Sequence, residues 1–305
     1  MFETLRCPVV SVLLVACLQA QAPRAGVFSG QAFPREAAMR QEDAPVEDGV
    51  TGKWGIDLPT GYYFRGIQIE NQGVIAQPYL ELVYGLHADD GMLRSVDAVF
   101  GVWNSLHDGP TGTGGGASAW YEGDFYAGLA VGLDRRWSVS ATYSYYASPN
   151  GLAALTEEAI VSLAFDDADL WGEASAGLQP AITFGFETKG QLDGGAGRGT
   201  YVQAAIEPGF ELGRVAGLDL SLALPLAVGF SLDDYYEDAN GRDRAFGFVD
   251  VGAVLSAPLP FVPARMGPWT LSLSVHALAL GSTPEALNGG DDIVVIGALG
   301  VSTIF

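Results

Sequence analysis

The stretch that decides the fold is the last one of the chain, residues 292–305, which reads DIVVIGALGVSTIF. Successive side chains of a strand point to opposite faces, so residues two apart share a face. One face of this stretch is mostly apolar and ends on the ring of Phe305, whereas the other face is small or mixed. The pattern predicts a β-strand, either an ordinary buried C-terminal strand or one with a lipid-facing side.

Earlier parts of the chain repeat this alternation and decide between the two. Together with the closing stretch they predict about twelve strands, an even number, as single-chain outer-membrane barrels of bacteria have. The earlier stretches are residues 53–65, 74–85, 95–105, 120–133, 137–147, 158–165, 177–187, 200–211, 218–230, 245–255 and 268–280.

The connections between these strands supply an independent indication. Those after odd-numbered strands include the long polar segments, and those after even-numbered strands are mostly shorter, such as 134–136 and 213–217. Long loops at one end and short turns at the other are typical of outer-membrane barrels, and a soluble sandwich has no reason to sort its loops in this way. We therefore predict an all-β fold, a transmembrane antiparallel up-and-down β-barrel of about 12 strands, over residues 51–305.

The N-terminal segment predicts export. Residues 1–22 have the basic start, apolar middle and small-residue end of a secretory signal peptide. An alternative is lipidation at Cys17, within a lipoprotein-like box at 14–17. Both cysteines lie in this segment, so the mature chain is expected to hold no disulfide. Residues 23–50 show no strand period and are expected to form a flexible lead-in or a plug within the barrel.

The segment GYYFRGIQ at 61–68 resembles the Y-x-F-R-G-I-x-Q opening of the proteobacterial TorF-type porin family, and similar spacing recurs at 178–186 followed by Tyr201. The resemblance covers about residues 53–211. It implies an outer-membrane barrel with a transport role, and it carries over no catalytic residues. A closing strand that ends on Phe also resembles this class of barrel, which implies that Phe305 is recognised by the barrel-assembly machinery.

Composition and motifs exclude several functions. The formal net charge of −21 argues against nucleic-acid binding, which requires a basic surface. No His/Cys/Asp cluster has metal-ligand spacing, and we expect no cofactor and no enzymatic activity. His87 and His107 are expected at an exposed turn and loop. His276 shares the inner face with Ser272 and Ser274, which leaves a barrel lipid hydrolase as a remote alternative.

The inner face carries the functional prediction. Acids outnumber bases there, and a charge-lined channel filters ions by sign. We expect Glu81, Asp97, Glu122 and Asp124 to lie together on one wall. The predicted pore-lining residues are Asp57, Arg65, Glu81, Asp97, Glu122, Asp124, Glu158, Glu187, Glu207, Asp219 and Asp250.

The sequence thus predicts a porin-like channel of the cell outer membrane, with a preference for small cationic solutes, open also to neutral ones. Outer-membrane lipid and lipopolysaccharide are its expected partners, the latter through a divalent-cation site in the acidic loop 233–241 unless that loop is merely solvated. An alternative is a non-conducting structural or adhesive barrel that acts through its external loops, with the inner acids hydrogen-bonded across a filled interior.

Overall fold

The computed structural model describes residues 49–171, 176–193, 195 and 197–305. The expected signal peptide, and the lead-in as far as residue 48, lie outside these residues. Within the described part of the chain, no helix is long and apolar enough to cross a membrane.

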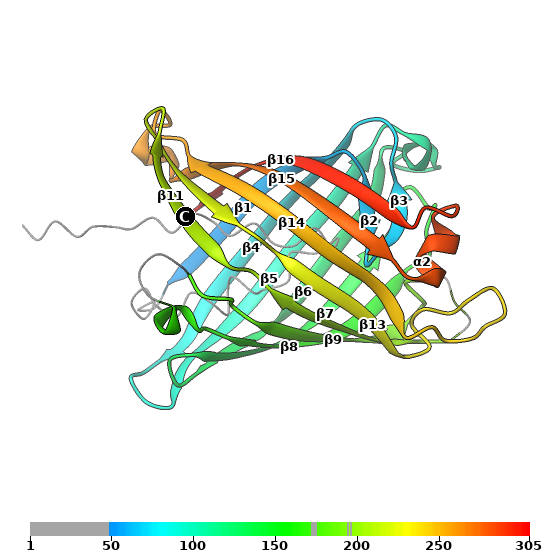
Figure 1. Cartoon of the computed structure of the whole chain (residues 1–305), viewed down its shortest axis with the longest axis horizontal. Coiled ribbons are helices and arrows are strands. Elements are labelled where there is room, and N and C mark those ends of the chain that lie inside the picture. The colour runs from blue at the N-terminus through cyan, green and yellow to red at the C-terminus, as the bar shows by residue number, and fades with distance from the viewer. Residues whose placement is uncertain (1–48, 172–175, 194, 196) are drawn as a thin grey trace, which may run out of the picture.

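Twelve antiparallel strands form a closed ring, which confirms the predicted fold class (Figure 1). Each strand pairs with the next one around the ring, and the last pairs with the first. In ring order the strands are β1 (Val50–Pro59), β4 (Ile75–Ala88), β5 (Leu93–His107), β6 (Trp120–Leu133), β7 (Trp137–Ala147), β8 (Thr156–Phe165), β9 (Ala181–Lys189), β10 (Thr200–Ile206), β13 (Leu226–Asp233), β14 (Phe246–Pro258), β15 (Trp269–Leu280) and β16 (Ile293–Ile304).

The seam between β16 and β1 closes the ring. Gly52 and Phe305 exchange two backbone hydrogen bonds, of 2.8 and 2.9 Å. The Phe305 ring lies directly over Gly52, where a Cβ atom would approach its Cζ to 2.4 Å. Next to this contact, the rings of Trp54 and Trp269 pack edge to face across β16, with centroids 4.8 Å apart. The terminal aromatic therefore belongs to the closure itself.

The first predicted strand, 53–65, ends earlier than expected. The wall strand stops at Pro59, and the chain then forms a separate two-stranded sheet of β2 (Tyr62–Phe64) and β3 (Ile67–Glu70). The physical reason is that all three residues of β2 are large aromatics buried on both sides, so they cannot alternate between lipid and interior. The turn between β2 and β3 has positive φ at Arg65 (49°) and Gly66 (86°).

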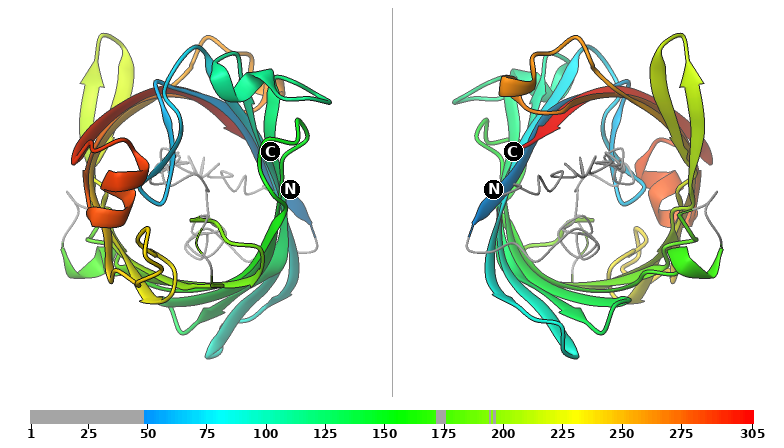
Figure 2. Two further views of the ribbon diagram at one scale, coloured as in Figure 1. Left: turned by 90° about the vertical axis from the view of Figure 1, so that its right-hand side faces the viewer. Right: turned by 90° about the vertical axis from the view of Figure 1, so that its left-hand side faces the viewer.

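Two other predicted strands, 200–211 and 218–230, are interrupted. After β10 the chain continues as β11 (Gly209–Val215), and β12 (Leu218–Ala223) precedes β13. Pro208 and Pro225 lie at the two breaks, where the missing amide hydrogen prevents a continuous ladder. The β11–β12 hairpin pairs with the ring through a short contact of β12 with β14 and projects from it (Figure 2).

The connections are sorted between the two ends of the barrel. At the end opposite the C-terminus lie 60–74, 108–119, 148–155, 190–199, 234–245 and 281–292, which include η2 (Pro110–Thr113) and α2 (Ser282–Leu287). The other end has short turns such as 134–136, but also two longer connections, with η3 (Ala168–Leu170) and η4 (Ala264–Met266). We refer to the first as the loop end.

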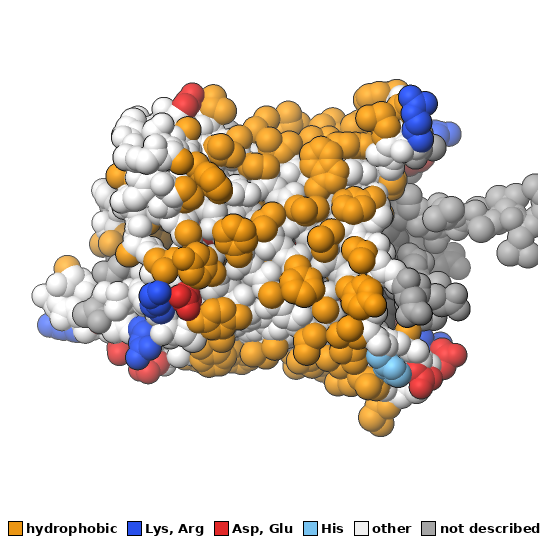
Figure 3. Space-filling model, turned by 180° about the vertical axis from the view of Figure 1, so that it is seen from behind, with side chains coloured by type: hydrophobic (Ala, Val, Ile, Leu, Met, Phe, Trp, Pro, Cys, Tyr) orange, Lys and Arg blue, Asp and Glu red, His pale blue; other side chains and the backbone are white. Residues whose placement is uncertain are grey.

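Apolar side chains cover the middle of the outer wall, and charged side chains gather towards its two ends (Figure 3). Phe100, Phe125, Leu273 and Val295 are 53%, 54%, 58% and 67% exposed. Exposed apolar area costs roughly 25 cal/mol per Å² in water, and soluble monomers rarely expose patches beyond a few hundred Å². The outer wall therefore has the surface of a barrel that lies in an apolar medium.

Deleting Phe305 tests its role in assembly. The deletion removes one backbone pair and one ring contact from a twelve-strand ring, so the finished barrel should melt at nearly the same temperature. The yield of folded protein in outer membranes should nevertheless fall sharply, because we expect the terminal aromatic to be recognised during assembly. Phe305→Trp, which keeps an aromatic end, should restore the yield. The measurement is the amount of protein that runs faster on gels unheated than boiled, and an unchanged yield would refute the role.

Candidate functional site in the barrel lumen

The β2–β3 hairpin lies inside the barrel at the loop end (Figure 2). It follows β1 in the chain, yet its turn residue Arg65 bonds to Glu158 on β8. Strand β8 lies five strands from β1 in one direction around the ring and seven in the other. The hairpin therefore reaches almost to the opposite wall.

Arg65 and Glu158 form a bidentate ion pair, in which the two guanidinium nitrogens donate to the two carboxylate oxygens at 2.7 and 2.8 Å. The two side chains are 1% and 0% exposed. The Tyr235 hydroxyl accepts a further hydrogen bond from Arg65 at 2.9 Å, and the Tyr146 hydroxyl donates to Glu158 at 3.0 Å. Such charge-assisted, two-point contacts fix geometry as well as supplying energy.

Aromatic rings surround the same guanidinium group. Its central carbon lies 4.1 Å from the ring centroid of Tyr201, 4.9 Å from that of Phe64 and 5.3 Å from that of Tyr235. A cation over a desolvated aromatic face gains about 2 kcal/mol. We call Arg65, Glu158, Tyr146 and these surrounding aromatic residues the latch.

Further hydrogen bonds tie the hairpin to other parts of the loop end. The backbone carbonyl of Arg65 accepts from the Tyr236 hydroxyl at 2.8 Å, and Asn288, just after α2, bonds to both Gly66 and Gln68 at 2.8 Å. On the other side, Tyr62 donates to Glu122 of β6 at 2.8 Å. The hairpin thus has side-chain contacts with several sides of the ring.

Glu70 fixes the far end of β3. Its carboxylate accepts hydrogen bonds from the backbone amide and hydroxyl of Thr111, at 2.9 and 2.7 Å, and from the amides of Asn71 and Gln72. Burial alone would raise the pKa of Glu70, but these hydrogen bonds outweigh it and lower the pKa. The ionised carboxylate therefore clamps the hairpin to the 108–119 connection.

Packed aromatic and aliphatic side chains fill the space around the hairpin. One buried cluster joins the hairpin to β10, to the 234–245 connection and to β14–β16, and a second joins it to β4 and β5. The first contains Tyr63, Tyr201, Tyr235, Tyr236, Phe248, Leu278, Leu280, Val294 and Ile296, and the second contains Tyr62, Phe64, Ile75 and Trp103. The described residues thus build a filled, tightly held loop end.

The structure places the predicted pore-lining residues in three environments. Six acids of the ring and its connections are buried, as is Arg65, and three acids are half-buried; Asp219 is exposed. The buried acids are Glu81, Asp124, Glu158, Glu187, Glu207 and Asp250, and the half-buried ones are Asp57, Asp97 and Glu122.

Asp219 does not lie on the inner wall, where the sequence predicted it. It lies on the projecting β11–β12 hairpin, its side chain is 63% exposed, and it pairs with Arg214 at 3.4 Å. The alternation of the Leu-rich stretch 218–230 places Asp219 inside only if that stretch is one continuous wall strand, and Pro225 interrupts it.

The four acids expected on one wall do lie on adjacent strands, β4, β5 and β6, but they are spread along the barrel. Asp97 pairs with Ala130, eight positions from Glu122 on β6, so these two acids are about 27 Å apart along the strands. Glu81 and Asp124 lie between them, and Glu81 accepts a hydrogen bond from Tyr126 at 3.0 Å. The acids therefore form a stripe along the wall, with no single ring of charge.

Several of these acids hold the interior together. Glu187 accepts from the backbone amides of Leu192 and Gly199, at 2.5 and 2.6 Å, and so orders the 190–199 connection. Glu122 and Glu158 likewise accept hydrogen bonds from Tyr62 and Arg65 of the hairpin. These acids therefore bind the segments that fill the lumen.

The histidines differ from expectation in one case. His107 is buried, bonds to Ser105 and Thr111 at 2.6 Å, and stacks on Tyr121 with centroids 4.9 Å apart. Sequence reasoning placed it in an exposed loop because it missed that β5 continues to residue 107.

His276 forms a buried pair with Asp250, with its Nδ1 atom 3.0 and 3.1 Å from the two carboxylate oxygens. A serine hydrolase requires a serine hydroxyl bonded to such a histidine. The hydroxyl of Ser274 is buried and makes no hydrogen bond, so it is not engaged in this way. Nor does any group of three His, Cys, Asp or Glu side chains within the described ranges have the geometry to hold a metal ion.

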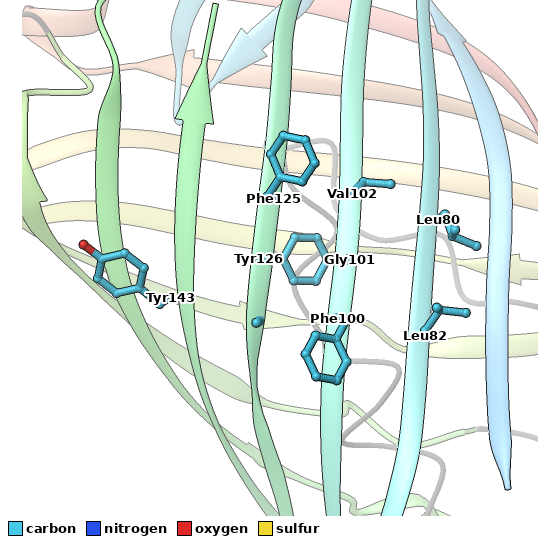
Figure 4. A pocket seen from close by; sticks show the side chains of 9 residues that line it. Leu80, Leu82, Phe100, Gly101, Val102, Phe125, Tyr126 and Tyr143 are labelled. Atoms are coloured by element: carbon cyan, nitrogen blue, oxygen red, sulfur yellow. The ribbon is translucent and has the colours of Figure 1, made fainter.

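A hollow of about 440 Å³ lies on the wall strands β4 to β7 (Figure 4). Its lining is almost entirely apolar and includes the exposed rings of Phe100, Phe125 and Tyr143. The outward side chains of the lining alternate along their strands with inward side chains such as Glu81, and Tyr126, which donates a hydrogen bond to Glu81, also borders the hollow. The hollow therefore belongs to the outer apolar belt and is no part of the lumen.

Comparison with known proteins shows similarity in fold only. Neither a family model nor a curated protein matches the chain, so membership of the TorF-type family stays a prediction. An outer membrane channel from Pseudomonas putida F1 is 13% identical, with 87% of this chain and 98% of that one covered and a TM-score of 0.47. The NanC porin is 14% identical, with coverages of 84% and 99% and a TM-score of 0.41. The β domain of the Bordetella autotransporter BrkA is 15% identical, with coverages of 84% and 98% and a TM-score of 0.39.

The latch makes a prediction about stability. Arg65→Ala leaves the Glu158 carboxylate buried without its partner, which typically costs about 3–5 kcal/mol of unfolding free energy. Removing both charges with Arg65→Ala and Glu158→Ala should cost less than the sum of the single losses. As a control, Arg94→Ala removes an exposed pair with Asp90 and should cost at most about 1 kcal/mol. Unfolding in detergent measures these costs, and an equal loss for Arg65→Ala and Arg94→Ala would contradict the role of the latch.

Proposed function

We propose that the protein is a gated channel of the bacterial outer membrane that passes small solutes and prefers cations. The observation that carries this proposal is a closed ring with an apolar outer belt and an acidic interior, filled at its loop end by a hairpin outside the ring's hydrogen-bond ladder. A wall of this kind is stable in lipid, because every strand has a partner on both sides.

The hairpin is the segment that can serve as a gate. β2 and β3 pair with each other in a sheet separate from the barrel, and the contacts described above between the hairpin and the ring are mainly made by side chains. Rotating the hairpin out of the lumen would break the latch and the bonds to Asn288 and Tyr236. It would also break the bond of Tyr62 to the wall and that of Glu70 to the 108–119 connection, but it would leave the strand pairing of the wall intact. The hairpin can therefore leave the lumen without the loss of the strand pairing that stabilises the barrel.

The preference for cations follows from the excess of inward acids. The bases that alternation predicts on the inner face are few, chiefly Lys53 and Arg65, and Arg65 is already matched by Glu158. Walls of low dielectric constant strengthen the effect of the remaining fixed charges on a passing ion. The stripe of acids along β4 to β6 would attract a cation at successive positions along the lumen.

A second candidate is the non-conducting structural barrel. It is favoured by the hydrogen bonds that Glu122, Glu158 and Glu187 make to the hairpin and the 190–199 connection, because these acids stabilise a filled interior. The two candidates differ in conductance. A barrel that never conducts in a planar bilayer, even with the latch broken, would support this alternative.

Selectivity tests the channel directly. In an Arg65→Ala background, where the latch is broken, changing Glu81, Asp97, Glu122 and Asp124 to Gln or Asn removes four negative charges at nearly constant size. The reversal potential in a KCl gradient should then move towards zero. The difference should be larger at low salt, since the screening length grows from about 10 Å at 0.1 M to about 30 Å at 0.01 M.

The matched control for this experiment is Asp219→Asn, which removes one charge from the projecting hairpin. It should leave the reversal potential unchanged, because Asp219 is exposed and paired with Arg214. A parent channel that passes chloride as readily as potassium would refute the preference for cations.

A further inference from the structure

We propose that the part of the latch that remains when the hairpin leaves is a binding site for organic cations, namely solutes with a guanidinium or alkylammonium group. This part consists of Glu158, Tyr146, Tyr201 and Tyr235, and we call it the cation box. In the structure the Arg65 guanidinium occupies it. The inference rests on the proposed channel function, because a solute reaches the box only through an open lumen.

The residues of the box and the group that occupies it come from different parts of the chain. Arg65 and Phe64 belong to the hairpin, whereas Tyr146, Glu158 and Tyr201 belong to the wall strands β7, β8 and β10. Tyr235 follows β13. Withdrawal of the hairpin therefore removes the guanidinium group and leaves a carboxylate, two tyrosine rings and a hydroxyl acceptor in place.

The box selects for positive charge. The Glu158 carboxylate is completely buried while the hairpin is in place, and the Tyr146 hydroxyl donates a hydrogen bond to it. Once the hairpin leaves, this carboxylate is the charged group of the box, and a fixed negative charge between walls of low dielectric constant attracts cations. A neutral solute would leave that carboxylate unpaired, and an anion would be repelled. An organic cation would restore the hydrogen bonds and stack on Tyr201 as Arg65 does.

The wall also provides room for this pair of groups. Gly185 of β9 lies beside it, and a Cβ atom there would come within 2.2 Å of a Glu158 oxygen and 3.2 Å of an Arg65 nitrogen. Any larger residue would displace the carboxylate from the guanidinium plane. The site is thus shaped by four neighbouring wall strands, β7 to β10, and by Tyr235, none of which belongs to the hairpin.

Competition then couples the solute to the gate. A ligand that binds only the open state shifts the equilibrium towards that state by its differential affinity. An organic cation in the box stabilises the open barrel, because Arg65 cannot return while its partner is occupied. The channel would in this way be opened by the class of solute that it carries.

The experiment uses the Arg65→Ala barrel in detergent with methylguanidinium chloride as the probe and equal potassium chloride as the salt control. Methylguanidinium at millimolar concentration should raise the unfolding temperature of Arg65→Ala, and potassium should not. Adding Glu158→Gln should weaken the apparent affinity about tenfold or more, as the loss of a charge-assisted pair implies. The matched control Arg94→Ala, which lacks the arginine paired with the exposed Asp90, should gain nothing from methylguanidinium.

Conductance separates this inference from the proposed function. If Arg65→Ala conducts but methylguanidinium neither stabilises nor blocks it beyond the effect of potassium, the cation box is wrong and the channel stands. If methylguanidinium stabilises Arg65→Ala while no variant conducts, the channel function fails, and with it the transport role of the box.

The native barrel gives a second readout that does not require the variant to fold. Methylguanidinium should lengthen the open times of the native channel, because Arg65 cannot return while the solute occupies Glu158, and equal potassium should not. Open times that are the same in both salts would overturn the proposal.

Discussion

Closure of the sheet is the constraint on which the rest of the structure depends. An outer surface covered with apolar side chains leaves the backbone no polar partners outside, so every strand has to pair on both edges. The seam between β1 and β16 meets this requirement, down to the paired amides of Gly52 and Phe305. Because the ring is closed, the polar and acidic faces of its strands are enclosed together, and the interior becomes a compartment.

At the loop end, the β2–β3 hairpin and the connections fill that compartment, and the pairing of the wall strands does not determine how they pack. A buried ion pair is weak evidence for net stability, because desolvation offsets much of the attraction, but it fixes one arrangement. Arg65 and Glu158 do this here, since no other base of the hairpin can satisfy Glu158. The same feature would make the arrangement reversible if, as we propose, an organic cation competes with Arg65 for that carboxylate.

The wall could be predicted from the sequence because a lipid-facing strand leaves a long alternating record, as in 120–133 and 137–147, whose bounds the structure reproduces. The prediction failed where the side chains no longer alternate between an apolar and a polar face, or where a proline interrupts the strand. The buried aromatics at 62–64 read as part of a wall strand, and the breaks at Pro208 and Pro225 moved Asp219 away from the ring. The latch could not be predicted from the sequence, because Arg65 and Glu158 lie 93 residues apart and meet only once the ring has closed.

The most direct test of a hairpin gate inside a fixed ring is a reversible cross-link between the two. Gly66 lies against Phe248 of β14, and a Cβ atom at Gly66 would be 3.3 Å from the Phe248 Cβ, close to the 3.5–4.5 Å of disulfides. In a chain with Cys7 and Cys17 replaced by serine, single-channel conductance of Gly66→Cys/Phe248→Cys should be lost on oxidation and return on reduction. Gly66→Cys alone carries the same backbone strain at the positive φ of Gly66 and should respond to neither. Equal conductance of the oxidised and reduced forms, with the cross-link verified, would contradict the gate.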